Sequence, residues 1–368
     1  MRGEVERQGV MLSVVSPEHR IRADHPLRRI KAIADAELQR LSPVFDAMYA
    51  DRGRPSIPPE RLLKACLLIA LYSVRSERQL CEQLEYNLLF RWFLDLGMRE
   101  DVFDASTFAK NKERLLGAEV APRFFEGVVA QAKAAHLLSA EHFSVDGTLI
   151  EAWASLKSFR PRAEEARDRR PPDDPGNPTV NFHGEQRSNA THVSLTDVEA
   201  ELARKGMGKE AKLAFGAHVL MENRHGLCVD ILVTKALSTT ERAAGLALVR
   251  RAKARGIRIG TLGGDKAYDT AAFVTGVRAE GVTPHVAQNI TAHRGSKIDG
   301  RTTRHRGYRL SQKCRKRIEE IFGWAKTVGG LRKTRYRGVQ RTGLWAYFVA
   351  AAYNLVRMAK LLAAPVPV

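Results

Sequence analysis

The chain has 368 residues, of which 44% are hydrophobic and 27% charged. This length allows two domains of ordinary size, and this composition excludes a chain that is disordered throughout. Lysine and arginine number 60 against 41 acidic residues, so the formal net charge is +19 at pH 7. A cationic surplus of this size favours a polyanionic partner, because binding to phosphates releases counterions. A protein that is merely basic is the alternative.

The sequence predicts neither secretion nor a membrane span. The first twenty residues are charged and contain no apolar run of the kind found in signal peptides. The two most apolar stretches, Leu67–Tyr72 and Leu344–Val356, are shorter than the ~20 residues that cross a bilayer. The four cysteines are scattered and form no Cys-x-x-Cys pair, so neither a zinc site nor a disulfide framework is expected. A reducing cytoplasm fits these features.

Helices are predicted from about residue 25 to 140. Apolar residues recur at helical spacing after Pro58-Pro59, and Ser76 with Gln79 forms a capping box that starts the next helix. The predicted helices cover Glu60–Val74, the segment after Ser76, Asn87–Asp95 and Ser106–Leu116. Short helices at these intervals fit a DNA-binding helix-turn-helix module and, equally well, a plain helical bundle.

After residue 140 the pattern changes to strands. His142–Asp146 is strand-like, and Leu149–Ala154 is a candidate hairpin partner across an Asp-Gly turn. Residues 160–190 break the periodicity with prolines among charged residues, which predicts a surface loop. Ala214–Glu222 and Leu227–Thr234 flank a turn-forming segment and predict a hairpin.

Helices and strands alternate in the rest of the chain. Ser238 and Glu241 form a capping box, and the helix that they open is expected to stop at Gly256. The elements predicted after it are a strand at Ile257–Leu262, a helix at Thr270–Glu280, a strand at Val282–Ala287, and helices at Ser311–Val328 and Leu344–Leu362. Hairpins followed by this alternation predict an α/β fold, a mixed sheet with helices packed on it.

Two aspartates are candidates for metal-dependent cleavage of a phosphodiester. Two divalent ions ~4 Å apart supply the activated water and stabilise the leaving oxygen, and Mg²⁺ prefers oxygen ligands. Asp146 lies in or at the end of a strand with apolar neighbours, and Asp265 follows a strand and two glycines at an edge where ligands bind. The alternatives are a turn role for Asp146 and a helix cap for Asp265. Asp269 is expected to cap the following helix.

Glu319 and Glu320 compete for a third acidic role, and helix phase separates them. At ~100° per residue, one side of the helix is an apolar stripe made of Ile318, Ile321, Phe322 and Ala325. Glu319 borders this stripe, whereas Glu320 points into solvent. Arg315 and Lys326 lie on the same edge as Glu319, which suggests a metal-binding Glu flanked by phosphate-binding cations. The alternative is an Arg315–Glu319 salt bridge worth a few tenths of a kcal/mol.

A basic surface is predicted around this helix. Between Arg294 and Arg341 the chain has sixteen Lys and Arg residues and three acids. Tyr308, Trp324 and Tyr336 are interleaved among these cations, as expected of a phosphate-contacting surface with stacking platforms. A solvated basic face is the alternative.

Three ordered motifs carry a family resemblance. They are Val145-Asp146-Gly147-Thr148, Asp265-Lys266-Ala267-Tyr268, and Arg315, Glu319 and Lys326 with three and six residues between them. Together they resemble the DDE transposases of bacterial insertion sequences, in particular insertion-sequence family five. Gln312 stands where this family usually has a tyrosine, which puts a local DNA contact in doubt. The segment from Arg54 to Phe93 also resembles the helical domain that precedes the catalytic core in this group.

The resemblance implies the fold, the ligands and the reaction. It implies a helical domain at 1–140 for DNA end binding and dimerisation, and an RNase H-like catalytic domain at 141–368. The loop-rich insertion in that domain is expected at about 155–212. Asp146, Asp265 and Glu319 would hold two Mg²⁺ or Mn²⁺ ions. The enzyme would cleave at terminal inverted repeats and transfer the 3′-OH ends to target DNA.

Further expectations concern partners. The expected DNA contacts are Arg315, Lys326, Lys266, Tyr268, Arg317, Trp324, Arg332, Lys333 and Arg335. A homodimer or higher oligomer is expected on DNA, because two ends must be joined, and a bacterial cytoplasmic location near the nucleoid follows. Two alternatives stay open: a related nuclease that cuts without transposing, and a non-catalytic protein that only binds DNA ends.

Overall fold

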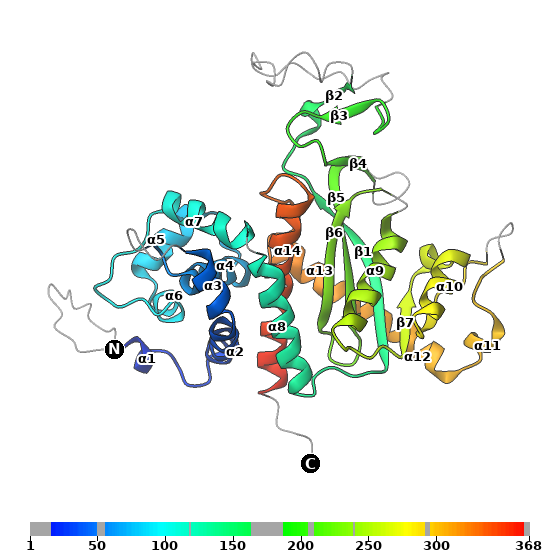
Figure 1. Ribbon diagram of the computed structural model, residues 1–368, viewed down its shortest axis with the longest axis horizontal. Helices are drawn as coiled ribbons and strands as arrows, with labels where there is room; N and C mark the ends of the chain where they lie inside the picture. The colour runs from blue at the N-terminus through cyan, green and yellow to red at the C-terminus, as the bar shows by residue number, and fades with distance from the viewer. Residues whose placement is uncertain are drawn as a thin grey trace, which may run out of the picture.

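The computed structural model describes residues 16–49, 56–117, 119–162, 187–204, 210–237, 240–290 and 295–363. Figure 1 shows helices of the first third of the chain on one side and a sheet with its own helices on the other. The long helix α14 (Val339–Leu361) and α8 (Val120–Ala134) lie side by side between these two parts. Among the described residues, no helix is long and apolar enough to cross a membrane.

The N-terminal part is helical, as the sequence predicts. Its remaining helices are α1 (Pro17–Arg20), α2 (Pro26–Arg40), α3 (Ser42–Met48), α4 (Pro59–Leu71), α5 (Glu77–Tyr86), α6 (Leu88–Phe93) and α7 (Ala105–Gly117). The Ser76 side chain accepts a hydrogen bond from the Gln79 N–H, so the predicted helix start is confirmed, although the Gln79 side chain accepts from the Arg75 N–H and not from Ser76. α14 packs on α8, α2 and α4, so the C-terminal helix shares a core with this part.

The main sheet has the strand order of the RNase H-like fold. Its strands are β1 (His142–Glu151), β4 (Glu201–Ala203), β5 (Lys212–Glu222), β6 (Cys228–Lys235), β7 (Thr261–Gly264) and β8 (Thr283–Val286). The order is β4-β5-β1-β7-β8, and β6 also pairs with β5. β5 is antiparallel to β1 and β6, whereas β7 and β8 run parallel to β1. The predicted fold class is therefore confirmed, and so is the β5–β6 hairpin.

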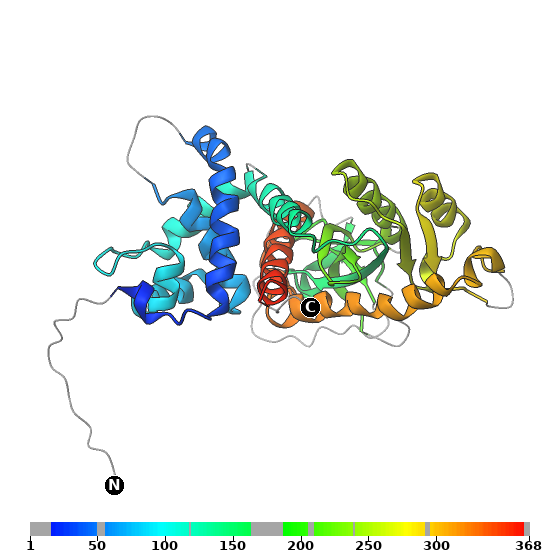
Figure 2. The ribbon, with the colours of Figure 1, turned by 90° about the horizontal axis from the view of Figure 1, so that it is seen from below.

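Helices cover both faces of the sheet, as Figure 2 shows. On one face α9 (Thr240–Ala254) packs on β5, β6 and β1, with α10 (Ala271–Ala279) beside it. On the other face lie α11 (Gly300–Thr303), α12 (Arg306–Cys314), α13 (Ile318–Thr327) and α14. The side chains of Trp345 and Phe348 on α14 are buried, and each such side chain contributes ~1.5–3 kcal/mol by leaving water.

Several sequence predictions about this part are wrong. β1 runs without a break from His142 to Glu151, so Asp146-Gly147 is not a hairpin turn, because β5 pairs with β1 along this whole length. β7 begins at Thr261 and not at Ile257. The helix predicted over Ser311–Val328 is two α-helices joined by a 3₁₀ turn at Arg315–Arg317.

The predicted insertion is partly described. Beyond β1, a 3₁₀ turn at Leu156–Ser158 leads to a small two-stranded sheet made of β2 (Phe159–Pro161) and β3 (His192–Ser194). β4 then returns to the main sheet and pairs with the start of β5. Residues 163–186 and 205–209 of the insertion lie outside the described residues. The insertion is therefore tied to the catalytic part by an added strand.

Candidate functional site

The sheet places Asp146 beside Asp265. In the parallel pair β1–β7, Ser144 is opposite Gly263, so two residues further along each strand bring Asp146 and Asp265 level with one another. Both aspartates line one open pocket, Asp146 from the middle of β1 and Asp265 from the carboxyl end of β7. In α/β sheets ligands bind at the carboxyl ends of parallel strands, and Asp265 lies there, as its position after two glycines predicts.

Asp265 also has the capping role that was its alternative explanation. It is the N-cap of the 3₁₀ turn Lys266–Tyr268, and its Oδ1 accepts a hydrogen bond from the Ala267 N–H at 2.8 Å. The residue is still partly exposed in the pocket. Asp269 does not cap α10, because Thr270 does. Asp269 instead accepts hydrogen bonds from the backbone N–H groups of Asn289 and Lys297.

The pKa of Asp146 reflects the burial of its side chain and the charges around it. Burial is the main cause that raises the pKa of Asp146 to about 6. The Gly147 N–H, which donates to Oδ1 at 2.8 Å, opposes this shift, and so does the positive charge of Arg315. The negative charges of Asp265 and Glu241 act in the same direction as burial. Asp146 is thus a carboxylate held among other acids, the arrangement that a bound cation relieves.

Glu241 is an acidic residue of this pocket that the sequence analysis missed. It lies in the first turn of α9 and lines the pocket with Asp146 and Asp265. Tyr268 points its hydroxyl at Oε1 of Glu241, 3.4 Å away. Burial, and then the charge of Asp265, raises the pKa of Glu241 above its usual value. The capping box explained this residue adequately in the sequence, so no signal pointed to a site; Ser238, its supposed partner, lies outside the described residues.

His218 of β5 completes this side of the pocket. Its side chain is only 4% exposed, and Nε2 lies 2.9 Å from Oγ1 of Thr234. Its Nδ1 is buried and has no hydrogen-bond partner in the described part of the chain. A Cβ atom on Gly147 would lie 2.8 Å from Oε1 of Glu241 and 3.1 Å from this Nδ1. The missing side chain of Gly147 therefore leaves space between two polar groups.

Helix α13 approaches β1 from the opposite face of the sheet. Lys326 donates from Nζ to Oγ1 of Thr148 at 2.6 Å, two residues beyond Asp146 on the same side of the strand. Arg315 acts on the pKa of Asp146, so its charge is near that carboxylate. Glu319 lies two helical turns before Lys326 on α13, so it is on the same edge of this helix.

The two glutamates of α13 are both exposed, but they differ in their contacts, and Glu320 does not point freely into solvent as helix phase predicts. Glu320 is ion-paired with Arg357 of α14 at 2.7 Å and with Arg317 at 3.6 Å. Glu319 is exposed and makes no hydrogen bond or ion pair with any described residue. The alternative Arg315–Glu319 salt bridge is absent from the described contacts, and Nε of Arg315 is buried without a partner. Glu320 has a structural role, whereas Glu319 is free to bind something else.

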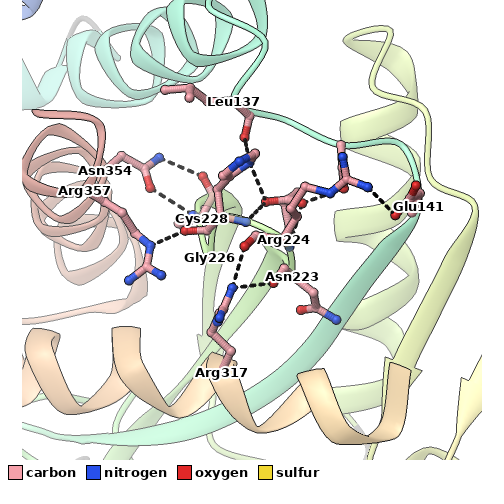
Figure 3. Close-up of polar contacts among 12 residues, drawn as sticks. Leu137, Glu141, Asn223, Arg224, Gly226, Cys228, Arg317, Asn354 and Arg357 are labelled. Atoms are coloured by element: carbon pink, nitrogen blue, oxygen red, sulfur yellow. Dashed lines mark hydrogen bonds and ion pairs between the residues drawn. The ribbon is translucent and has the colours of Figure 1, made fainter. Parts of the chain in front are cut away.

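A polar network fixes α13 relative to the β5–β6 turn, as Figure 3 shows. Arg317 donates from Nη1 to the carbonyl oxygens of Asn223, at 2.8 Å, and of Arg224. Asn354 of α14 bonds to both backbone groups of Cys228, at 2.9 and 2.7 Å. Arg317, predicted as a DNA contact, is therefore engaged in positioning the helix.

The aromatic rings predicted to contact DNA differ in their burial. Tyr268 is fully buried and packs on Phe273, and Gly264 leaves room for it, because a Cβ atom there would lie 3.3 Å from the ring. Trp324 packs edge-on against Tyr353, and Tyr308 and Tyr336 also pack against the core. The predicted cations Lys266, Arg332, Lys333 and Arg335 are exposed. Of these, Arg335 also donates to the carbonyl oxygen of Val74 at 3.0 Å.

The donors in the pocket suit a hard divalent ion. Carboxylate oxygens are the preferred ligands of Mg²⁺, which keeps several waters and needs only one or two carboxylates. Asp146, Asp265 and Glu241 supply such oxygens, and the unpartnered Nδ1 of His218 adds a polar group beside them. Within the described residues, no three side chains are close enough to enclose an ion. The pocket therefore fits an ion that shares its ligands with water and substrate.

The sheet has the RNase H-like strand order, and two aspartates on neighbouring parallel strands lie near a basic helix. These features define a metal-dependent enzyme that acts on nucleic acid. Two family models identify the class of enzyme. A model described as a transposase domain (DUF772) matches residues 15–114, and a model described as a transposase DDE domain matches residues 176–355. Together they span about three quarters of the chain, which belongs to the DDE transposases and is a DNA transposase.

The solved structures that resemble the chain are distant. A Mos1 transposase paired-end complex with the left transposon end is 11% identical, covers 76% of this chain and 83% of that one, and has a TM-score of 0.21. The Mos1 strand transfer complex is 13% identical, covers 78% of this chain and 83% of that one, and also has a TM-score of 0.21. Likenesses this weak carry no argument about the site. No curated protein matches the chain.

The match to the DDE model does not extend to every proposed site residue. Asp265 and Glu319 lie inside the matched range, whereas Asp146 precedes it. The case for Asp146 therefore depends on the register of β1 with β7. Enzymes of the DDE class use divalent metal ions and act on DNA, and the particular ions and DNA sites belong to the proposal below.

Proposed function

We propose that this transposase cleaves DNA at the terminal inverted repeats of an insertion sequence and transfers the freed 3′-OH ends to target DNA. Asp146, Asp265 and Glu319 are its catalytic carboxylates, and they hold two Mg²⁺ or Mn²⁺ ions. The observation that carries the proposal is the position of Asp146 beside Asp265 in one open pocket. When bound, such ions activate the attacking oxygen and stabilise the leaving one.

Asp146 is the central ligand in this proposal, because acidic residues approach it from both faces of the sheet. Glu241 lies on the α9 side, where it shares the pocket with Asp146 and Asp265. Glu319 lies on the α13 side, on the helix edge that carries Lys326. We assign Glu319 as the third ligand and Glu241 as a fourth acidic group, whose charge would help to hold the ions.

The cations of the site act on the DNA backbone. Arg315 has an unpartnered, buried Nε next to Asp146, and a phosphate held by the metal ions would lie within its reach. Lys326 is fixed by Thr148 on the same face. Both would neutralise the phosphate charge at the scissile bond, while Lys266, Arg332 and Lys333, which are exposed, bind flanking phosphates.

Joining two transposon ends requires at least a dimer on DNA. In this proposal residues 1–140 bind the DNA ends and dimerise, and residues 141–368 carry the catalytic site. The insertion contributes Asn189, Leu202 and Arg204 to the wall of the catalytic pocket. It therefore helps to position the DNA strand that enters the pocket.

The Asp265→Asn variant tests the assignment. This change keeps the shape of the side chain and its cap to Ala267 but removes the charge that binds metal. Strand cleavage of end DNA in Mg²⁺ should fall by at least about 100-fold, since even residues that only support a metal ligand cost 10–100-fold. Binding to the same DNA in EDTA should stay within about threefold of the wild type. Normal cleavage by this variant would refute the site.

A related nuclease that cuts without transposing is the second candidate. The same carboxylates would serve it, so cleavage alone does not separate the two functions. A strand-transfer assay does, because a transposase joins precut ends to a plasmid in Mg²⁺, whereas a nuclease releases only cut products. The third candidate, a protein that only binds ends, would show neither activity.

A further inference from the structure

A second pocket lies at the opposite ends of the strands that carry the catalytic aspartates. It contains the first residues of β1, β7 and β8, which are His142, Thr261 and Thr283. Asp146 lies in the middle of β1 and Asp265 directly after the end of β7, and both line the other pocket, so this pocket is not part of the catalytic one. The helices α10, α11 and α12 surround this edge of the sheet in Figure 1.

The N-terminus of α12 opens into this pocket. His305 is the N-cap of this nine-residue helix, and its side chain makes no capping hydrogen bond. Gly307, in the first turn, lines the pocket together with His305. The first N–H groups of a helix have no partner within it and carry a partial positive charge, so they attract anions.

His285 provides a second and independent sign of a ligand. Its side chain is 4% exposed, its Nδ1 is buried without a hydrogen-bond partner, and it lines the same pocket. Its ring lies 6.0 Å from that of His142 and packs edge-on against Tyr308. A Cβ atom on Gly307 would lie 3.7 Å from Cε1 of His285, so glycine keeps the space above the ring open. A buried polar atom that lacks a partner costs free energy unless a ligand supplies one.

The charges around the pocket are mainly positive. Arg278 is exposed and makes no ion pair with a described residue. The one acid of the pocket, Asp299, is neutralised by Arg301 at 2.8 Å. Exposed cations continue along α11 and α12, namely Arg304, Arg306, Arg309 and Lys313. A metal ion is not the expected ligand, because the described residues contain no group of three that could hold one.

We propose that this pocket binds a phosphate group of the DNA backbone. The N-terminus of α12 and the His285 ring contact the phosphate, and Arg278 neutralises its charge at the rim. The exposed cations of α11 and α12 favour a polyanion over a free anion, because they extend the positive surface beyond one phosphate. The proposal rests on the chain acting on DNA but not on the assignment of the metal ligands.

The salt dependence of DNA binding tests this site. The full chain is titrated into a random-sequence DNA duplex in EDTA, and the Kd is measured at several salt concentrations. The slope of log Kd against log salt should fall by about 0.9 in Arg278→Ala, the value for one lost phosphate contact on duplex DNA. Arg258→Ala is the matched control, because Arg258 is exposed, is near the same strand and does not line the pocket. An equal change in both variants, or none in either, would overturn the proposal.

A spectroscopic measurement identifies the ligand at His285 itself. The ring signals of the eleven histidines are recorded in ¹⁵N-labelled protein, and His285 is assigned by its loss in His285→Gln. DNA should shift this signal in EDTA, and the Asp265→Asn variant should show the same shift, which separates this site from the catalytic one. A shift with inorganic phosphate but not with DNA would mean that the pocket binds a free anion, and the proposal would be wrong.

Discussion

Lys326 on α13 donates a hydrogen bond to Thr148 on β1, and this contact fixes which edge of the helix faces the catalytic strand. Glu319 lies two helical turns before Lys326 on that edge, whereas Glu320 is turned toward α14 and pairs with Arg357. Glu319→Gln should lower strand cleavage in Mg²⁺ by at least about 100-fold with an unchanged melting temperature. Glu320→Gln should keep its cleavage rate and lose stability instead, through its broken ion pairs. Equal loss of cleavage in both variants would contradict the assignment.

The assignment of Glu241 as a fourth acidic group of the site leads to a separate prediction. Glu241→Gln should weaken Mn²⁺ binding to the full chain by about 10–100-fold, measured by the free-Mn²⁺ signal in electron paramagnetic resonance. The charge change is the cause, because the amide keeps the size of the side chain and its contact with Tyr268. Glu280→Gln is the control, since Glu280 is ion-paired with Arg250 on the far side of α9. If Glu241→Gln binds Mn²⁺ as the wild type does, Glu241 has no part in the metal site.

The Gly147→Ala variant tests the position of the Glu241 carboxylate without changing any charge. A Cβ atom there would lie 2.8 Å from Oε1 of Glu241, so Gly147→Ala must push this carboxylate or His218 aside. The side chain of Glu241 is flexible, so we expect little loss of stability but about a 10-fold loss of cleavage. The melting temperature and the cleavage rate of one preparation separate the two effects. A variant with full activity would show that the position of Glu241 is unimportant.

His285 gives stability a defined pH dependence. Burial, with the nearby His142 and His305, lowers the pKa of His285 from 6.5 to about 4. The unfolded chain therefore takes up a proton as the pH falls below 6.5, whereas the folded chain does not until about 4. The free energy of unfolding should thus fall as the pH is lowered through this window. Urea unfolding across this range should give a flatter profile for His285→Gln than for the wild type; identical profiles would contradict the assignment.

Much of the fold was predictable because local signals agreed with the tertiary structure. Capping residues such as Ser76 and the glycine at 256, which has a φ of +71°, marked helix ends correctly. The hairpin at Asp146-Gly147 was wrong because the Asp-Gly pair is a local turn signal, whereas β5 pairs with β1 across it. Pairing over that distance along the chain leaves no trace in a short window of sequence.

Parts of the candidate site could be proposed from a single helix or a single strand. Helix phase separated Glu319 from Glu320, since each residue's direction follows from the apolar stripe. The burial of Tyr268 was not predictable, because it depends on which elements pack around the ring in the folded chain. Glu241 and His218 reach the pocket from α9 and β5, and only the assembled sheet brings them next to Gly147.

The position of the metal ions is the central claim, and affinity cleavage tests it most directly. Fe²⁺ replaces Mg²⁺ in the full chain, and ascorbate with peroxide then generates hydroxyl radicals that cut the backbone next to the bound ion. The account predicts cuts beside Asp146 and beside Asp265, which excess Mg²⁺ suppresses and Asp265→Asn abolishes. Cuts elsewhere in the chain, or cuts that persist in Asp265→Asn, would contradict it.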